Sequence, residues 1–251
     1  MKKILVIALL TTQYLFALIT ITPVDIGEKP GVSGKLEAGL ETKRGNTEKD
    51  NYKASARINY DNNSSYVIWG EFSSEYGEST YVKDTNKAFS HLRFIHSLTD
   101  NKDLVYELFA QLQSDEFRQI NSRILGGAGL RYRVFNSAKA GKGFVGLGGF
   151  YEDIQYKDSK KDPEEDNIRV NSYLAYKVDI SDISSLSYVF YYQPKVDAFS
   201  DHSISNQIEL KLHILKKLFL KFNVTWDDDS KPPSGVKRDD FTQTTTFVFE
   251  F

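Results

Sequence analysis

One period, of two residues, runs through almost the whole chain and limits the fold more than any other feature. In KLFLKFNVTW, the apolar residues Leu218, Leu220 and Phe222 alternate with the polar residues Lys221 and Asn223. NQIELKLHI, at 206–214, alternates in the same way. Strict alternation predicts strands with one apolar and one polar face. No helical period of comparable length is present in the remainder, so we expect an all-β fold.

Turn signals divide the chain into twelve segments of this kind. They fall at 32–44, 49–60, 65–76, 87–98, 103–114, 121–135, 142–156, 167–180, 184–194, 203–214, 217–227 and 240–251. Most are about 11 to 14 residues long. Strands of soluble proteins usually have about 5 to 6 residues, whereas a tilted membrane-spanning strand needs about 9 to 11. The lengths therefore predict a twelve-stranded antiparallel transmembrane β-barrel.

The connections between these segments support a barrel. Every second connection is short, at 61–64, 99–103, 136–141, 181–184 and 215–217. The intervening ones are mostly longer and polar, at 77–86, 157–166, 194–202 and 227–239, with the short 45–48 as an exception. Transmembrane barrels have short periplasmic turns and longer extracellular loops. We therefore expect both ends of the barrel chain on the periplasmic side.

The N-terminus has the pattern of a secretory signal peptide. Lys2 and Lys3 precede an apolar run that begins at Ile4. Thr11, Thr12 and Gln13 interrupt this run, which makes an uncleaved membrane anchor the weaker alternative. We assign 1–17 to a signal peptide, 18–31 to an N-terminal periplasmic segment and 32–251 to the barrel.

Composition excludes several classes of protein. Lys and Arg total 32 and Asp and Glu total 34, so the charge balance gives no case for a nucleic-acid partner. The chain has no Cys, which excludes a disulfide framework, a thiolate metal site and a lipid-anchored cysteine.

The two faces of the segments have different chemistry. In the first ten segments, even-numbered positions are apolar or small wherever the alternation is clear, as at Leu36, Leu108 and Leu130. The segment 142–156 is ambiguous, because FVGLGGF is apolar or Gly on both faces. If the apolar face meets lipid, the polar face lines the lumen. A soluble, lipocalin-like barrel is the alternative; it would turn its apolar face inward and would usually be smaller.

The predicted lumen carries charges of both signs. Its candidate lining residues are Arg57, Glu71, Arg93, Glu107, Arg131, Arg133, Arg169, Glu209, Lys211 and Lys221. Buried charges persist when they are paired, so pairing across strands would narrow the interior. Trp69 and Phe109 also face inward and would fill it further. We therefore expect a narrow or gated channel for small polar solutes or ions; a structural, salt-bridged barrel without transport remains the alternative.

An open path would test the choice between these two alternatives. A lumen open along Arg131, Arg133, Arg169 and Lys211 would favour a channel with a mild anion preference. A closed interior crossed by Arg–Glu pairs would favour the structural barrel.

The chain ends in an aromatic strand, FTQTTTFVFEF. Phe241, Phe247, Phe249 and Phe251 share one face, and threonines occupy the other. We expect the Phe row to meet lipid and the strand to close the barrel against SGKLEAGLE. A terminal strand of this form resembles the signal read by the outer-membrane barrel assembly machinery, with Phe247, Phe249 and Phe251 as the signal residues.

Three stretches carry a resemblance to a known family. SGKLEAGLETKRGNTEKDNYKASARINYD, LGGAGLRYRVF at 125–135 and DSKPPSGVKRDDFTQTTTFVFEF resemble the salt-induced outer-membrane protein family, a domain of unknown function in Gram-negative bacteria. The resemblance covers essentially the whole mature chain. It implies an outer-membrane barrel surrounded by lipids and lipopolysaccharide, and its name suggests a link to salt or envelope stress. The family supplies no catalytic or ligand residues to carry over.

Some outer-membrane barrels are enzymes, such as outer-membrane phospholipase A and the lipid A deacylases. Such a site needs a Ser or water activated by a His that a third group holds. Of the four His, His202 has the best position, beside Asp201 and Ser203, but neighbours in sequence do not form a triad. We expect no catalytic residue, no cofactor and no metal site.

A divalent cation is the one ligand that the loops suggest. Asp227, Asp228 and Asp229 could hold a cation that bridges lipopolysaccharide phosphates. A solvated acidic loop is the simpler interpretation.

Overall fold

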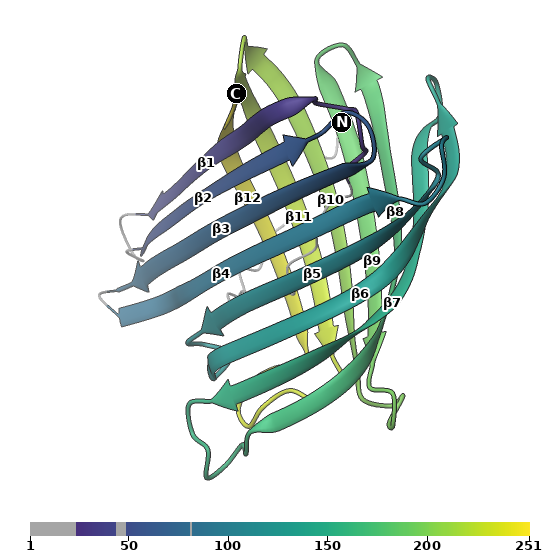
Figure 1. Ribbon diagram of the computed structural model, residues 1–251. Helices are drawn as coiled ribbons and strands as arrows, with labels where there is room; N and C mark the ends of the chain where they lie inside the picture. The colour runs from purple at the N-terminus through teal and green to yellow at the C-terminus, as the bar shows by residue number, and fades with distance from the viewer. Residues whose placement is uncertain (1–23, 44–48, 81) are drawn as a thin grey trace, which may run out of the picture.

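The chain folds into a single closed barrel of twelve antiparallel strands, and each strand pairs with its neighbours in sequence (Figure 1). The computed structural model describes residues 24–43, 49–80 and 82–251. The strands are β1 (Gly31–Lys43), β2 (Lys49–Asp61), β3 (Tyr66–Ser79), β4 (Val82–Ser97), β5 (Leu104–Asp115), β6 (Ile120–Ser137), β7 (Gly141–Tyr156), β8 (Glu165–Ser181), β9 (Ser184–Pro194), β10 (His202–Leu215), β11 (Leu218–Asp229) and β12 (Asp239–Glu250). The predicted twelve-stranded barrel is confirmed.

The described part of the chain contains no helix long and apolar enough to cross a membrane. The predicted signal peptide, 1–17, lies outside the described residues.

The two ends of the barrel differ in their connections. Five tight turns gather at one end, which we call the short-turn end, and β1 begins there. The opposite end, the loop end, carries the longer connections 157–164, 195–201 and 230–238. The predicted loop 77–86 is wrong, because β3 and β4 stay paired as far as Ser79 and Val82. Glu78 lies opposite Lys83 there, and opposite charges stabilise a cross-strand pair.

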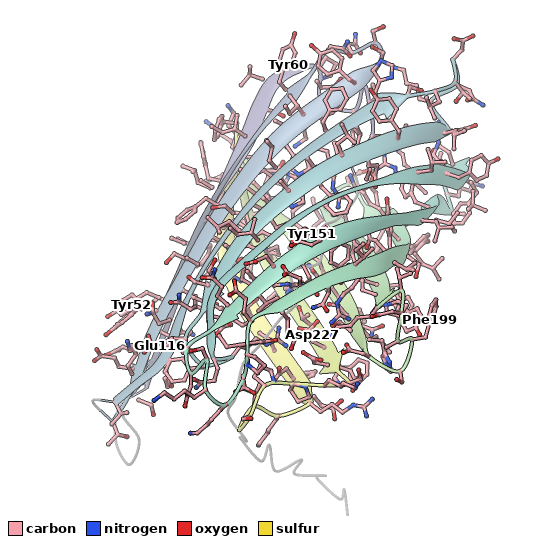
Figure 2. All side chains as sticks on the ribbon, turned by 60° about the horizontal axis from the view of Figure 1, so that its bottom comes forward. Tyr52, Tyr60, Glu116, Tyr151, Phe199 and Asp227 are labelled. Atoms are coloured by element: carbon pink, nitrogen blue, oxygen red, sulfur yellow. The ribbon has the colours of Figure 1, made fainter. Side chains whose placement is uncertain are left out.

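Apolar side chains cover the outer wall. Val32, Leu40 and Leu147 are 71%, 67% and 65% exposed. Figure 2 shows Tyr52 and Tyr60 on the outside of the strands, and both rings are exposed. A soluble barrel would bury such residues in its interior. This apolar outer wall is therefore inconsistent with a lipocalin-like protein and typical of a transmembrane barrel.

Strand β7 resolves the ambiguous register. Its odd-numbered residues face outward, as exposed Leu147 and Tyr151 show, whereas Phe144 and Phe150 are buried inside the barrel. The other strands up to β11 follow the even-outward pattern, as at Leu108. The inner face of FVGLGGF therefore carries both large aromatic rings and glycines. For this reason the sequence shows no polar residues that would mark the inward face of this stretch.

The last strand closes the barrel at the short-turn end. Gly34 and Phe251 exchange both backbone hydrogen bonds, at 2.9 and 3.0 Å. The rings of Phe247, Phe249 and Phe251 are exposed on the outer wall. Their role as an assembly signal stays a prediction.

Candidate functional site: the lumen

A buried charged layer crosses the lumen at Glu107. Its carboxylate lies 3.8 Å from Arg93 Nη1 and 3.4 Å from Arg131 Nη1. The hydroxyl of Tyr173 on β8 donates a hydrogen bond of 2.7 Å to the same carboxylate. All three charged side chains are at most 3% exposed. Since β5 and β8 are not neighbours in the barrel, this layer joins separate parts of the wall across the interior.

Aromatic rings fill the space around these guanidinium groups. The guanidinium carbon of Arg93 lies 5.2 Å from the ring centre of Phe109, and that of Arg131 lies 5.1 Å from Phe144. On the neighbouring strands, Arg57 stands 4.8 Å over the ring of Trp69. A cation over an aromatic face is stabilised most where water is excluded. The lumen beside β3–β9 is therefore packed like a protein core, and we call it the filled half.

Glu152 anchors a second buried cluster nearer the loop end. It is fully buried, and its carboxylate lies 2.5 Å from both Arg123 Nη2 and Arg169 Nε. Arg169 also pairs with Asp201 at 3.1 Å, and Asp201 with Lys195 at 2.8 Å. A buried carboxylate remains charged in such a position because two guanidinium groups compensate it.

Sequence reasoning missed Glu152 because the register of β7 was ambiguous. One signal could have found it. Arg169, a predicted inward residue, and Arg123, which has the same odd parity, lie on the two strands that flank 142–156, and two inward arginines need an acid between them. Only the register with odd-numbered residues outward places Glu152 there.

Glycine makes room for the ring of Tyr173. A Cβ atom at Gly146 would lie 2.0 Å from Tyr173 Cε1, so no larger residue fits without moving the ring. We expect Gly146→Ala to reduce the free energy of unfolding by about 1–3 kcal/mol, as overpacking generally does. Gly126→Ala is the control, because its Cβ would meet its nearest neighbour at an ordinary 4.0 Å. Equal unfolding midpoints in urea for the two variants would contradict the packing argument.

The segment before β1 folds into the short-turn end of the lumen. Ile26 is 8% exposed and packs among Val67, Trp69, Ile95 and Val105. Arg131 donates a hydrogen bond of 2.9 Å to the backbone carbonyl of Val24. The predicted periplasmic segment 18–31 thus has a defined place from residue 24 onward, which the sequence pattern did not indicate.

Charged contacts hold the same segment to several strands. Asp25 pairs with Lys142 at 2.7 Å, Glu28 with Lys177 at 2.6 Å and Lys29 with Glu250 at 2.6 Å. Burial alone would raise the pKa of Glu28, but the ammonium group of Lys177 outweighs it and the pKa is lowered. The carboxylate of Glu28 therefore stays charged and paired at neutral pH.

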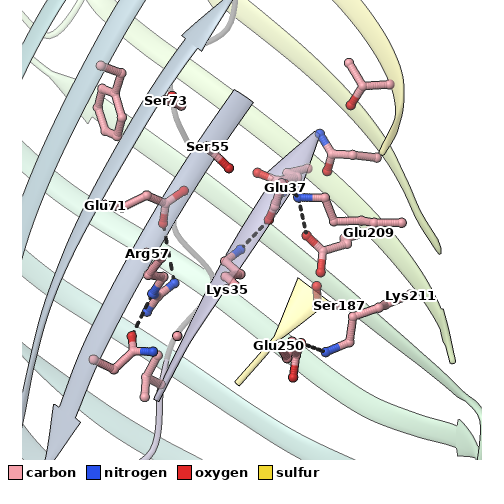
Figure 3. A pocket seen from close by; sticks show the side chains of 18 of the residues that line it. Lys35, Glu37, Ser55, Arg57, Glu71, Ser73, Ser187, Glu209, Lys211 and Glu250 are labelled. Atoms are coloured by element: carbon pink, nitrogen blue, oxygen red, sulfur yellow. Dashed lines mark hydrogen bonds and ion pairs between the residues drawn. The ribbon is translucent and has the colours of Figure 1, made fainter. Parts of the chain in front are cut away.

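A polar hollow of about 310 Å³ remains, lined mainly by β1–β3 and β10–β12, with a few residues of β4, β5, β8 and β9 such as Lys87, Gln113 and Ser187 (Figure 3). Its charged lining is self-paired: Lys35 lies 2.7 Å from Glu37, Lys211 lies 2.7 Å from Glu250, and Arg57 lies 3.6 Å from Glu71. Hydroxyl and amide side chains make its other wall, among them Asn223, Thr225, Thr242 and Thr244. We call this space the hollow. The hollow is lined mostly by polar side chains, with nearly equal numbers of acidic and basic groups.

Nine of the ten predicted lumen residues divide between the hollow and the filled half, and the tenth lies at the short-turn end. Arg57, Glu71, Glu209, Lys211 and Lys221 line the hollow. Arg93, Glu107, Arg131 and Arg169 are buried in the filled half. Arg133 lies at the short-turn end, where Arg133 Nη2 is 2.6 Å from Asp103. The four residues expected along an open basic path are therefore each ion-paired, and they do not share one passage.

The remaining polar candidates have structural partners. His202 Nε2 lies 3.7 Å from Asp228 Oδ1, whereas Asp201 turns to Arg169 and Lys195. Asp228 also binds Arg238 at 2.5 Å, and buried Asp227 accepts a hydrogen bond from Ser205. No group of three His, Asp or Glu is arranged for a metal ion within residues 24–43, 49–80 and 82–251. Asp227, Asp228 and Asp229 do not converge on one point.

Comparison with solved structures shows the fold alone. The chain is similar to the COG4313 outer membrane channel from Pseudomonas putida F1, with a TM-score of 0.56 and 11% identity over 92% of this chain and 100% of that chain. It is also similar to the NanC porin, with a TM-score of 0.45 and 11% identity over 87% and 96% of the two chains. No curated protein matches the chain in sequence. Residues 36–251 match the family described as "Protein of unknown function, DUF481", and the chain belongs to this family.

Proposed function

We propose that the protein is an integral outer-membrane β-barrel that forms a narrow channel for small polar solutes or ions. The observation that carries this proposal is the hollow. Its lining begins at Asp61 and Glu28 near the short-turn end and extends to Lys87 and Gln113 near the loop end. A continuous polar space along a barrel is what a conducting path requires. The COG4313 channel of similar fold supports the proposal.

The orientation follows from the connections. The short-turn end faces the periplasm and the loop end faces outward, among lipopolysaccharide. In this scheme 1–17 is removed as a signal peptide, and the barrel assembly machinery reads the terminal Phe row during insertion. The apolar outer wall, with Leu36 and Phe247 exposed, supports lipid contact.

The hollow argues for size selection and against strong charge selection. Most acidic groups in it have a basic neighbour, as in the pair of Lys221 with Glu37. A pore with one dominant sign of charge would favour one sign of ion. We therefore expect a small conductance with similar permeabilities for K⁺ and Cl⁻.

Planar bilayers test this directly. Purified barrel is expected to give small, stable single-channel steps, and a KCl gradient is expected to give a reversal potential close to zero. Lys211→Glu should shift that potential toward cation preference, because it replaces a basic group of the lining with an acidic one. Lys160→Glu, in an exposed loop, is the control and should leave it unchanged. The absence of steps above background would reject the channel.

A structural barrel without transport is the second candidate, and the Glu107 layer favours it. That layer and the Glu152 cluster close one half of the lumen with paired charges. The link to salt stress that the family resemblance suggests is compatible with both candidates. This link predicts that the amount of transcript rises at high salt, and an unchanged amount of transcript would contradict it.

A further inference from the structure

The seam between the first and last strands is only partly closed. β1 pairs with β2 along its whole length, from Gly31 to Lys43. With β12, however, β1 is paired over a short stretch only. Gly34 exchanges backbone hydrogen bonds with Phe251, and the paired residues then run from Lys35↔Glu250 to Ala38↔Phe247. The same register would place Leu40 opposite Thr245, yet that pair is absent from the described ladder. Transmembrane barrels normally close completely, because an unpaired strand edge in hydrocarbon is costly.

The inner side of this seam is polar and under-satisfied. Thr242 and Thr246 are 6% and 2% exposed, and neither their hydroxyl groups nor that of Thr244 between them has a hydrogen-bond partner among the described residues. Thr242 and Thr244 line the hollow, as do Glu37 and Lys221. A buried hydroxyl without a partner is destabilising, so a polar group bound here would be stabilised.

The outer side of the seam is apolar. Leu40, Phe241 and Phe247 are 67%, 59% and 57% exposed on the strands that border it. The unpaired edges therefore separate a hollow lined by charges of both signs from an apolar wall. One molecule satisfies both surfaces when it has a zwitterionic head group and an apolar chain.

We propose that the open part of the seam admits a single-chain amphiphile of the lysophospholipid class. Its phosphate takes hydrogen bonds from the Thr242 and Thr244 hydroxyls, which are next neighbours on the inner face of β12, and faces the ammonium of Lys221. Its cationic group faces Glu37 and Glu209, and its chain leaves between β1 and β12 along Leu40 and Phe241. The inference rests on the proposed membrane location of the barrel and not on ion conduction.

A second copy of the chain, pairing edge to edge, is the rival occupant. The hollow favours the amphiphile, because a strand added outside would leave about 310 Å³ and the threonine hydroxyls unfilled. Light scattering in detergent distinguishes the two. We expect a monomer, and a stable dimer abolished by Leu40→Pro would overturn the proposal.

The chain has no native Cys, which permits a clean cross-linking test. The variant L40C/T245C would lock the open part of the seam, and L36C/F249C would cross-link a pair that is already in register. A fluorescent lysophosphatidylcholine is titrated against each barrel in non-ionic detergent. Oxidised L40C/T245C should bind it at least tenfold more weakly than the wild type, and reduction should restore binding. Oxidised L36C/F249C should bind it as the wild type does.

Two results would overturn the proposal: equal binding by locked and unlocked barrels, or no saturable binding by the wild type. If the cysteines of L40C/T245C do not react, T242A/T244A carries the test, because loss of both hydroxyls should weaken binding at least tenfold. Conductance is recorded on the same proteins. A locked barrel that conducts but no longer binds the probe supports both proposals, and unchanged binding with normal conductance removes only this one.

Discussion

Replacement of Glu107 by Gln is expected to destabilise the barrel by about 3–5 kcal/mol, because it leaves two buried arginines without their shared counter-charge. Arg93 and Arg131 are 2% and 3% exposed and cannot turn to water. The residue keeps its shape, so the loss would come from charge. Urea unfolding of the refolded barrel in detergent or liposomes measures the change.

Two further variants keep this prediction falsifiable if Glu107→Gln does not fold. Tyr173→Phe removes only the hydrogen bond to the Glu107 carboxylate and should cost roughly 1.5–3 kcal/mol. Glu209→Gln is the matched control, because Glu209 lies on the hollow, 3.9 Å from Lys221, and should cost less than about 1 kcal/mol. Similar losses for Glu107 and Glu209 would mean that the layer across the lumen does not stabilise the fold.

The second large effect concerns the segment inside the short-turn end. Ile26→Asp would place a carboxylate among Val67, Trp69, Ile95 and Val105. Burying an unpaired charge there costs several kcal/mol, so the segment should leave its place. We expect single-channel conductance to rise several-fold, because Val24, Glu28 and Lys29 border the hollow.

Ile26→Leu is the matched control for this experiment. It keeps the volume and the apolar character of the side chain and should conduct as the wild type does. If Ile26→Asp folds and its conductance equals that of the control, the segment does not restrict the path. If both variants gain conductance, packing at this position and not charge holds the segment.

Much of the fold follows from local pattern. The period of two placed every strand, and the even-numbered apolar row predicted the outer wall at Leu36 and Leu108. Alternation along a strand determines on which face of the strand a side chain lies, and this depends only on the neighbouring residues in the sequence. It failed at FVGLGGF, where both faces are apolar or Gly, and at 77–86, where polar residues continue the strands beyond the apolar wall.

The site was less predictable than the wall. The pattern named Glu107 and Arg131 as inward residues, yet it could not say that Tyr173 reaches the same carboxylate from across the barrel. Nor could it place Glu152 between Arg123 and Arg169, or Ile26 beside Trp69. These contacts join residues that are far apart in sequence, so they depend on the register and closure of the whole sheet.

The sequence by itself thus determined a twelve-stranded barrel with an apolar exterior and a charged interior, because side chains alternate wherever a strand forms. Only the tertiary structure decided that one half of the interior is packed and the other hollow, and that the β1–β12 seam is incomplete. The reason is physical: a strand's own residues set its two faces, whereas the distance across a lumen exists only after all the strands have closed around it.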